Sequence, residues 1–279
     1  MSIWYWLCEL IPTEMLRWDF MKNALLAVLL MTPLFGLTST MVVTGRMSFF
    51  SDALGHSAFS GIAIGSILGI FAPTWAAVLF SILFALLFCL VRSKSNHSAD
   101  TLIGVFSSAA VAFGIFITTQ GGSSFTKYNT YLIGDVLSVT PGQIGLLAIV
   151  LLLVILFWLV FSNRLTLSTI HPQLAASRGI PTWLTETLFT IFLAVIVTLS
   201  ISWVGLLILN SLLVLPGAAS RNVAKNMHQY HLFSILFALI GGIAGLTICY
   251  YLSASAGACI SLVLTLIFAV SLCFRKART

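Results

Sequence analysis

Long apolar runs recur along the whole chain, each close to 20 residues in length. A helix of that length spans the hydrocarbon core of a membrane, and one soluble core cannot bury so many such runs. Only 7% of the 279 residues are charged, which is typical of a protein with several membrane spans. The run 146–161 is apolar on every side, so it lacks the alternation that a β-barrel strand requires. We therefore predict an all-α, polytopic bundle of membrane helices.

Nine segments have the length and apolarity of a span. They are 24–43, 49–70, 74–91, 101–120, 143–162, 186–203, 204–219, 232–252 and 256–274. The segment 204–219 is short and contains Asn210 and Pro216, so a broken helix there would leave eight spans. The sequence thus predicts a domain of eight or nine transmembrane helices over residues 24–274. An interfacial segment, 1–23, precedes it and a basic cytoplasmic tail, 275–279, follows it.

The positions of lysine and arginine predict the orientation of the spans. If the connection after the first span is cytoplasmic, only Arg17, Lys22 and Lys127 of the 13 basic residues lie outside. This distribution satisfies the positive-inside rule, with the N-terminus outside and the C-terminus inside. Nine spans fit that parity, whereas an eight-span fold would have to move the N-terminus or demote one of the segments. The basic residues form no cluster, so we expect no nucleic-acid partner.

The segment 49–70 differs from the other apolar segments because it carries an aspartate and a histidine four residues apart. On a helix, Asp52 and His56 lie one above the other and can hold one ion together, and Ser48 and Ser60 extend the same row. A carboxylate with an imidazole suits zinc, manganese or iron. Spacing alone leaves two interpretations open: a metal site, or a structural pair that is hydrogen-bonded internally or lies near the cytoplasmic interface.

The same segment carries a second row, made of glycines. Gly61, Gly65 and Gly69 follow one another at intervals of four residues. Where side chains are missing, two membrane helices can approach closely. We therefore predict that this row packs against a neighbouring helix.

Two connections are longer than a tight turn, and each contains candidate functional residues. In the outer connection, 121–142, Asp135 either receives an incoming cation or caps a turn. In the cytoplasmic connection, 163–185, a short helix can start after Pro172 and end at Gly179. A small helix on that face is a natural docking element for a partner protein.

The chain carries no motif for nucleotide binding. It lacks a G-x-x-x-x-G-K-[ST] phosphate loop and any segment with the charge content of a soluble ATPase domain. We expect a transport subunit rather than an enzyme, with no permanently bound cofactor. Any ATP hydrolysis would take place in a separate subunit.

Four blocks of this sequence resemble, in the same order, the membrane permeases of ABC-type zinc, manganese and iron importers. In the first block, 45–61, Asp52 and His56 match the acidic and histidine positions of the family signature. The other blocks are 100–104, 131–141 and 204–219. The resemblance covers nearly the whole chain. It departs at Ser51, where the family usually has glycine, and at 253–257, which lacks the family's aspartate and proline.

The resemblance implies a type II importer fold and a multi-pass permease of the bacterial inner membrane. The expected substrate is a divalent metal ion, with zinc favoured over manganese and iron, and Asp52 and His56 are the expected ligands. The implied partners are cytoplasmic ATPase subunits, an extracytoplasmic metal-binding protein, a second permease copy and membrane lipid. The residues that resemble the helix docking into the ATPase are His171, Pro172, Leu174, Ala175 and Gly179.

Two other classes of function remain alternatives. A secondary transporter or channel would use Asp52 and His56 as a proton relay and would need no ATPase. A membrane scaffold without transport activity would tolerate loss of both side chains. Co-purification with an ATPase distinguishes the first alternative from an ABC permease.

Overall fold

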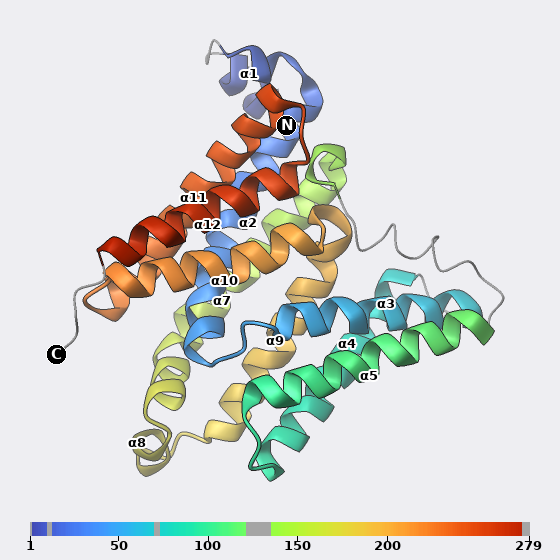
Figure 1. Ribbon diagram of the computed structural model, residues 1–279, viewed down its shortest axis with the longest axis vertical. Coiled ribbons are helices and arrows are strands. Elements are labelled where there is room, and N and C mark those ends of the chain that lie inside the picture. The colour runs from blue at the N-terminus through green and yellow to red at the C-terminus, as the bar shows by residue number, and fades with distance from the viewer. Residues whose placement is uncertain (1, 10–12, 70–72, 121–134, 275–279) are drawn as a thin grey trace. The chain divides into compact units, whose positions relative to one another are not determined.

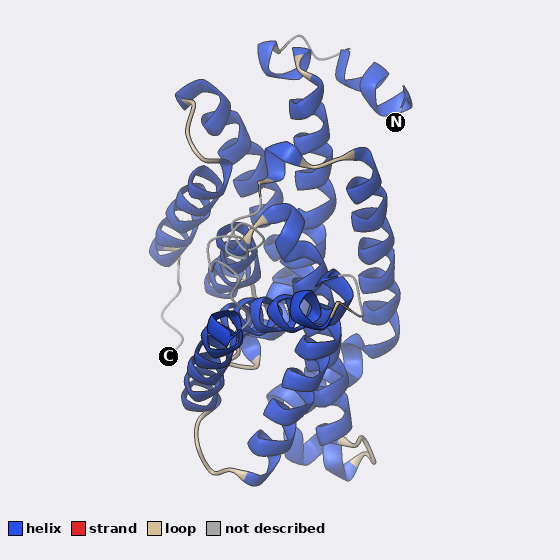
Figure 2. Cartoon of the chain, turned by 90° about the vertical axis from the view of Figure 1, so that its right-hand side faces the viewer, coloured by secondary structure: helices blue, strands red, loops and turns tan. Residues whose placement is uncertain are grey.

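The computed structural model describes residues 2–9, 13–69, 73–120 and 135–274 (Figure 1). Regular structure in these ranges is helical throughout, and Figure 2 shows no strand in them. Two single turns of 3-10 helix, η1 (Glu14–Arg17) and η2 (Val136–Ser138), accompany the α-helices. The α-helices are α1 (Ser2–Glu9), α2 (Asp19–Thr44), α3 (Phe50–Leu68), α4 (Pro73–Lys94), α5 (Ala99–Gln120), α7 (Pro141–Ile170), α8 (Pro172–Ser177), α9 (Thr182–Val204), α10 (Leu206–Val223), α11 (Met227–Leu252) and α12 (Ala256–Cys273).

All nine segments expected from the sequence are helices, and eight of them are long and apolar enough to cross a membrane. These eight, within the described residues, are α2, α4, α5, α7, α9, α10, α11 and α12. The ninth is α3, which has the length of a span but is rich in polar and small residues. The protein is therefore a multi-pass membrane protein, and α3 is the long helix, among those described, that falls below the apolarity of a span.

The segment 204–219, in which the sequence allows Pro216 to break the helix, instead forms one continuous helix, α10. It is therefore not the segment that falls short of a span. Pro216 has no backbone N–H, and a proline inside a helix commonly disturbs the backbone hydrogen bonds around it. The N–H of Gly217 donates to the hydroxyl of Ser39 on α2, at 2.9 Å. Ser39 is fully buried, so this bond satisfies a backbone group inside the protein.

The chain divides into two compact units. The first contains residues 1–40, 135–156 and 203–279, and the second contains residues 41–134 and 157–202. The first unit thus holds most of α2, the first half of α7, and α10 to α12. The second unit holds α3, α4, α5, α8 and nearly all of α9, together with both candidate ligands.

Small residues hold the helices of the first unit close together. A Cβ atom on Gly245 of α11 would lie only 2.5 Å from the Cα of Ile260 on α12. The hydroxyls of Ser211 on α10 and Ser261 on α12 lie 2.6 Å apart. Close backbone approach and interhelical hydrogen bonds are the usual means by which helices associate in lipid.

The N-terminal helix α1 is attached to the first turns of α2. The indole N–H of Trp4 donates to the carbonyl of Lys22 at 2.9 Å, and the Tyr5 hydroxyl donates to Asn23 Oδ1 at 2.8 Å. Close by, the rings of Trp6 and Trp18 are exposed. Exposed tryptophans beside the polar first turn of a span are typical of the interface between lipid and water. The interfacial role expected for residues 1–23 remains a prediction.

The connection expected to be cytoplasmic differs from the loop predicted over 163–185. Helix α7 continues to Ile170, the short helix α8 follows, and α9 already begins at Thr182. Asn163 and Arg164 mark the end of the apolar run but do not break a helix, and Pro172 is the first residue able to do so. Polarity therefore marks the edge of the membrane segment and not the end of the helix.

Candidate functional site

The candidate ligands lie in the first two turns of α3. Asp52 is in the first turn, where a carboxylate faces the positive end of the helix dipole. Its Oδ2 lies 3.6 Å from Nε2 of His56, one turn further along the helix. From residue 51 to residue 63, every residue except these two is buried. The Asp52 side chain is 44% exposed and the His56 side chain 31% exposed, so a single narrow face of α3 is open.

The distance within this pair suits two donors that share one ion. An ion bonded to nitrogen and oxygen at about 2.1 Å each, with a tetrahedral angle, places those donors about 3.4 Å apart. The separation of 3.6 Å between Asp52 Oδ2 and His56 Nε2 is close to this value. Among the described residues, no group of three or more His, Cys, Asp or Glu side chains could hold a metal ion. An ion held between these two side chains would need further ligands from outside this pair.

Helix α3 is fixed to α4 by small and aromatic residues. A Cβ atom on Gly61 would lie 2.6 Å from the Cα of Ala77 on α4. The hydroxyls of Ser57 and Ser81 lie 3.1 Å apart, and the ring of Phe50 lies 4.9 Å from that of Phe88 between centroids. These contacts face α4, so they leave the opposite side of α3 for Asp52 and His56.

A second set of contacts fixes α3 to α5. The Ser60 hydroxyl donates to the carbonyl of Ala110 at 2.8 Å. A Cβ atom on Gly114 would lie 2.7 Å from both this hydroxyl and the ring of Phe59. The backbone beneath the two ligands is consequently held by helices on two sides.

The polar row predicted from the sequence is shorter in the structure. Ser48 lies in the turn before α3 and not on the helix, and Ser60 is fully buried in its bond to α5. In the glycine row, Gly61 and Gly65 do face α4, but Gly69 ends α3 with a φ of 63° and has open space around it. Gly69 thus terminates the helix, because a residue without a Cβ adopts this left-handed conformation readily.

Asp135 lies in the first unit and caps η2. Its carboxylate accepts a hydrogen bond from the N–H of Leu137 at 3.0 Å, and its side chain is exposed. This is the turn-capping arrangement that the sequence allowed. Residues 131–134, which precede it in the block resembling the family, lie outside the described residues.

The proposed docking residues form one small, exposed element. Pro172 occupies the start of α8 and His171 its N-cap position. At the other end the N–H of Gly179 bonds to Ala176 O, and the N–H of Ile180 bonds to Ala175 O. This pattern of two bonds closes a helix with a left-handed residue, and Gly179 has a φ of 73°. Except for buried Ala175, the residues of α8 are exposed and free to meet a partner.

The sequence did not suggest a further ionic contact in this unit. Arg92, at the end of α4, lies 4.0 Å from Glu186, near the start of α9. In the sequence, both residues look like ordinary charges at the ends of spans. Their ion pair forms because two helices that are far apart in the sequence pack against each other. No local spacing signal could have found it.

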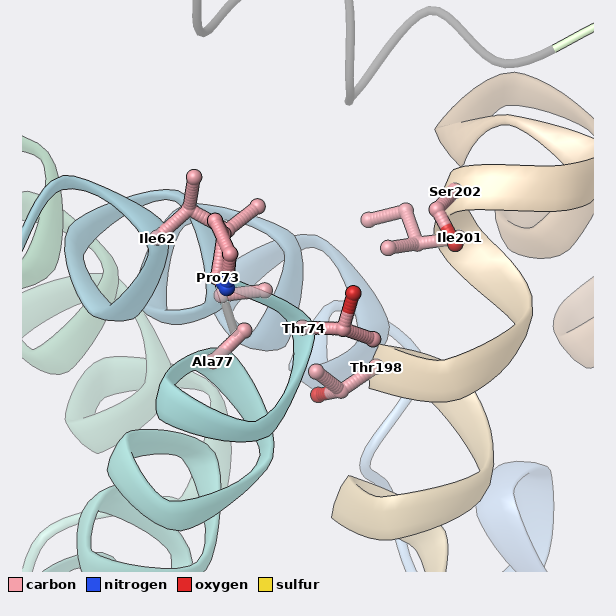
Figure 3. Close-up of a pocket in the computed structure, with 8 residues that line it drawn as sticks. Ile62, Pro73, Thr74, Ala77, Thr198, Ile201 and Ser202 are labelled. Atoms are coloured by element: carbon pink, nitrogen blue, oxygen red, sulfur yellow. The ribbon is translucent and has the colours of Figure 1, made fainter. Parts of the chain in front are cut away.

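A small pocket lies between α3, α4 and α9 (Figure 3). Figure 3 shows the side chain of Thr198 pointing from α9 toward α4, close to Thr74. Thr198 is buried, and its hydroxyl has no hydrogen-bond partner among the described residues. The full lining is Ala58, Ile62, Pro73, Thr74, Ala77, Thr198, Ile201 and Ser202.

Known proteins that resemble this chain do so over nearly its whole length, and two of them are membrane proteins of metal transport systems. The high-affinity zinc uptake system membrane protein ZnuB of Haemophilus influenzae is 27% identical, covering 85% of this chain and 90% of that protein. The manganese transport system membrane protein MntC of Listeria innocua is 26% identical, covering 93% and 92%. The structure of PsaBC from Streptococcus pneumoniae in complex with Fab matches with a TM-score of 0.78 at 25% identity, covering 91% of each chain.

A family model matches a stretch of this chain that contains all the long helices and both candidate ligands. The profile described as the ABC 3 transport family matches residues 17–275, from the turn before α2 to the end of α12. The match includes the Asp52 and His56 pair and the exposed helix α8. This chain belongs to the ABC 3 transport family.

Proposed function

We propose that this chain is the membrane permease of an ATP-driven importer of divalent transition metal ions. The observation that carries the proposal is the pair of Asp52 and His56, which share the only open face over residues 51–63 of α3. An ionisable pair on a membrane helix is costly unless it has a task, and these two groups suit a borderline metal ion. Family membership supports a transport role for the chain.

In this proposal the two side chains ligate the ion only transiently. A site with a complete protein coordination shell would bind too tightly for the ion to leave. Asp52 and His56 supply two ligands, and the remaining positions are left for water or for groups from a second permease copy. The pair thus serves as a relay position along the path and not as a storage site.

Zinc is the substrate that we propose to test first, with manganese and ferrous iron as the alternatives. ZnuB, named for zinc, and MntC, named for manganese, are almost equally similar to this chain. Selectivity among such ions depends on ligand type, geometry and metal availability. One carboxylate and one imidazole are compatible with all three ions.

The energy for transport comes from partners. We propose that cytoplasmic ATPase subunits dock on α8, and that an extracytoplasmic protein delivers the metal to a pair of permeases in the bacterial inner membrane. The exposed surface of α8 and its rigid closure at Gly179 support its docking role. Helix α8 thus presents a structured, exposed element to a partner.

Reconstitution with the cognate ATPase and binding protein tests this function. Vesicles containing the complex should accumulate radioactive zinc or manganese only when ATP is hydrolysed, and an ATPase variant unable to hydrolyse ATP should abolish accumulation. Equal accumulation by the permease alone, driven by a proton gradient, would instead establish a secondary transporter. No accumulation of zinc, manganese or iron under any of these conditions would contradict a metal permease.

A further inference from the structure

The open face of α3 begins one turn before the candidate ligands. Phe49 occupies the N-cap position, and its carbonyl accepts a hydrogen bond from the N–H of Ala53 at 3.2 Å, so Phe49 already lies on the first turn of the helix. Residues 49, 52 and 56 are three and four positions apart, a spacing that places side chains on one helix face. Phe49 is 68% exposed. Phe49, Asp52 and His56 therefore form one exposed row, called here the open stripe.

The residue after Phe49 fixes how this end of α3 is rotated. Phe50 is fully buried, and the centroid of its ring lies 4.9 Å from that of Phe88 and 6.5 Å from that of Phe84, both on α4. Successive side chains on a helix point about 100° apart. Because Phe50 is held against α4, the ring of Phe49 is directed to the open side of the helix, which agrees with its exposure.

The turn that leads into α3 has a defined structure. The N–H of Met47 donates to the carbonyl of Val42 at 2.9 Å, and the Met47 side chain is buried. Between these two residues, Arg46 has a φ of 55°, a left-handed conformation that residues other than glycine rarely adopt. Such a conformation persists only where the surrounding contacts enforce it. Phe49 is therefore positioned by a closed turn on one side and a packed neighbour on the other.

The open stripe does not face lipid. A carboxylate exposed to hydrocarbon is costly, so the face that carries Asp52 and His56 borders water or another protein surface. Phe49 lies on the same face, although an exposed phenyl ring is unfavourable in water. Phe116 on α5, which is 60% exposed, is different, because α5 is apolar enough to span the membrane and its exposed rings can meet lipid. The exposure of Phe49 is thus not explained by lipid contact.

In the orientation predicted from the basic residues, α3 starts at the cytoplasmic side of the membrane. Phe49 then lies between the ligand pair and the cytoplasm. We propose that Phe49 is a gate, whose ring closes the cytoplasmic end of the ion's path against the second permease copy until the docked ATPase moves it aside. An apolar ring offers no ligand to replace the water around an ion, and hydrophobic constrictions close pores by excluding water. The inference rests on the proposed function and adds the residue that prevents leakage between transport cycles.

A leak assay tests the gate. Vesicles that contain the permease with its ATPase, and that enclose a metal-sensitive dye, are given external Zn²⁺ or Mn²⁺, whichever the wild type accumulates with ATP. Entry is measured without nucleotide and with a non-hydrolysable ATP analogue, because alternating access opens the outer end of the path in one of these states. Phe49→Ala should raise the rate of entry in that state about tenfold, which corresponds to about 1.4 kcal/mol and is less than the burial of a phenyl ring contributes.

Two further variants control this assay. Phe49→Leu keeps an apolar side chain and should stay close to the wild-type rate. Phe116→Ala removes a ring of similar exposure from α5 and should not leak. Wild-type rates of entry through Phe49→Ala in both nucleotide states would overturn the proposal, and so would equal leakage through Phe116→Ala.

Chemical restoration of the ring distinguishes a gate from a structural role. In a chain whose native cysteines are replaced by alanine, Phe49→Cys should leak as Phe49→Ala does. A benzyl methanethiosulfonate then attaches a phenyl ring: the thiolate attacks the thiosulfonate sulfur, a disulfide forms and methanesulfinate leaves. This ring should return the leak to the wild-type rate, whereas a charged thiosulfonate of similar length should not. Equal leakage after the two reagents would contradict the gate. The reagents act after assembly, so this experiment decides even if Phe49→Ala does not assemble.

The unmodified complex separates this inference from the proposed function. Wild-type vesicles that accumulate neither zinc, manganese nor iron with ATP would contradict the proposed function itself. Wild-type vesicles that accumulate metal with ATP, combined with Phe49→Ala vesicles that do not leak, would overturn the gate alone and leave the ligand pair in place.

Discussion

Helices α3 and α7 differ in a telling way: the more polar helix is the buried one, and the more apolar helix is the exposed one. In α3, which carries Asp52, His56 and several serines, nearly every residue from 51 to 63 is buried. In α7, the most apolar stretch is only 28% buried, and leucines such as Leu152 and Leu159 are exposed. In a soluble protein the apolar helix would be the buried one. Within lipid, the protein interior is where polar groups can be placed and satisfied, and therefore where a transport site can lie.

The largest effect is expected from placing a charge on the exposed face of α7. Leu153 is 50% exposed near the middle of the apolar run. Leu153→Asp should disfavour membrane insertion by about 3 kcal/mol, because this face meets hydrocarbon and offers the carboxylate no partner. The amount of protein in the membrane fraction measures this, with Leu153→Phe as the control. Normal insertion of the aspartate variant would mean that this face of α7 is not in lipid.

A smaller effect is expected from adding a side chain in the packed interface of α3. Gly61→Leu should destabilise the fold by about 1–3 kcal/mol, because a Cβ atom already meets the α4 backbone. Gly145→Leu in α7 is the matched control, since nothing lies within 4 Å of a Cβ there. Thermal unfolding in detergent measures both. Equal melting temperatures for the two variants would show that α3 does not pack closely on α4.

The smallest effect concerns the hydrogen bond between α3 and α4. A double-mutant cycle with Ser57→Ala and Ser81→Ala should give a coupling energy of about 0.6 kcal/mol, the usual size for interhelical bonds in membranes. Such bonds are weak because the separated helices also find partners. Denaturant unfolding of the three variants and the wild type gives the value. A coupling of zero would remove this bond from the contacts that hold α3.

Much of this architecture could be predicted from the sequence. Apolar length located every long helix, and Pro172 with Gly179 located the short helix α8. Helix ends were less accurate, since α7 runs on to Ile170 through polar residues that do not break a helix. The family resemblance, carried by Asp52 and its neighbours, agreed with the family match of the whole chain. These successes depend on signals that are local in the sequence.

The features that escaped prediction depend on packing between distant segments. The row through Ser60 looked like a polar stripe, but its hydroxyl is taken up by the carbonyl of Ala110 on α5. Gly69 looked like a packing residue but serves to end α3. The Arg92–Glu186 pair joins two helices whose adjacency no spacing rule reveals. Neighbours of a helix face decide whether its polar groups are satisfied, exposed or paired, and the sequence does not specify those neighbours.

Metal uptake by ligand variants is the most direct test of the central claim that Asp52 and His56 ligate the transported ion. Radioactive zinc and manganese would be supplied to cells that express this chain with its ATPase and binding protein. The account predicts that Asp52→Ala combined with His56→Ala abolishes uptake at normal membrane levels and normal assembly, while Ser57→Ala on the same helix retains it. Unchanged uptake in the double variant, or failure of that variant to assemble, would contradict the ligand role of the pair.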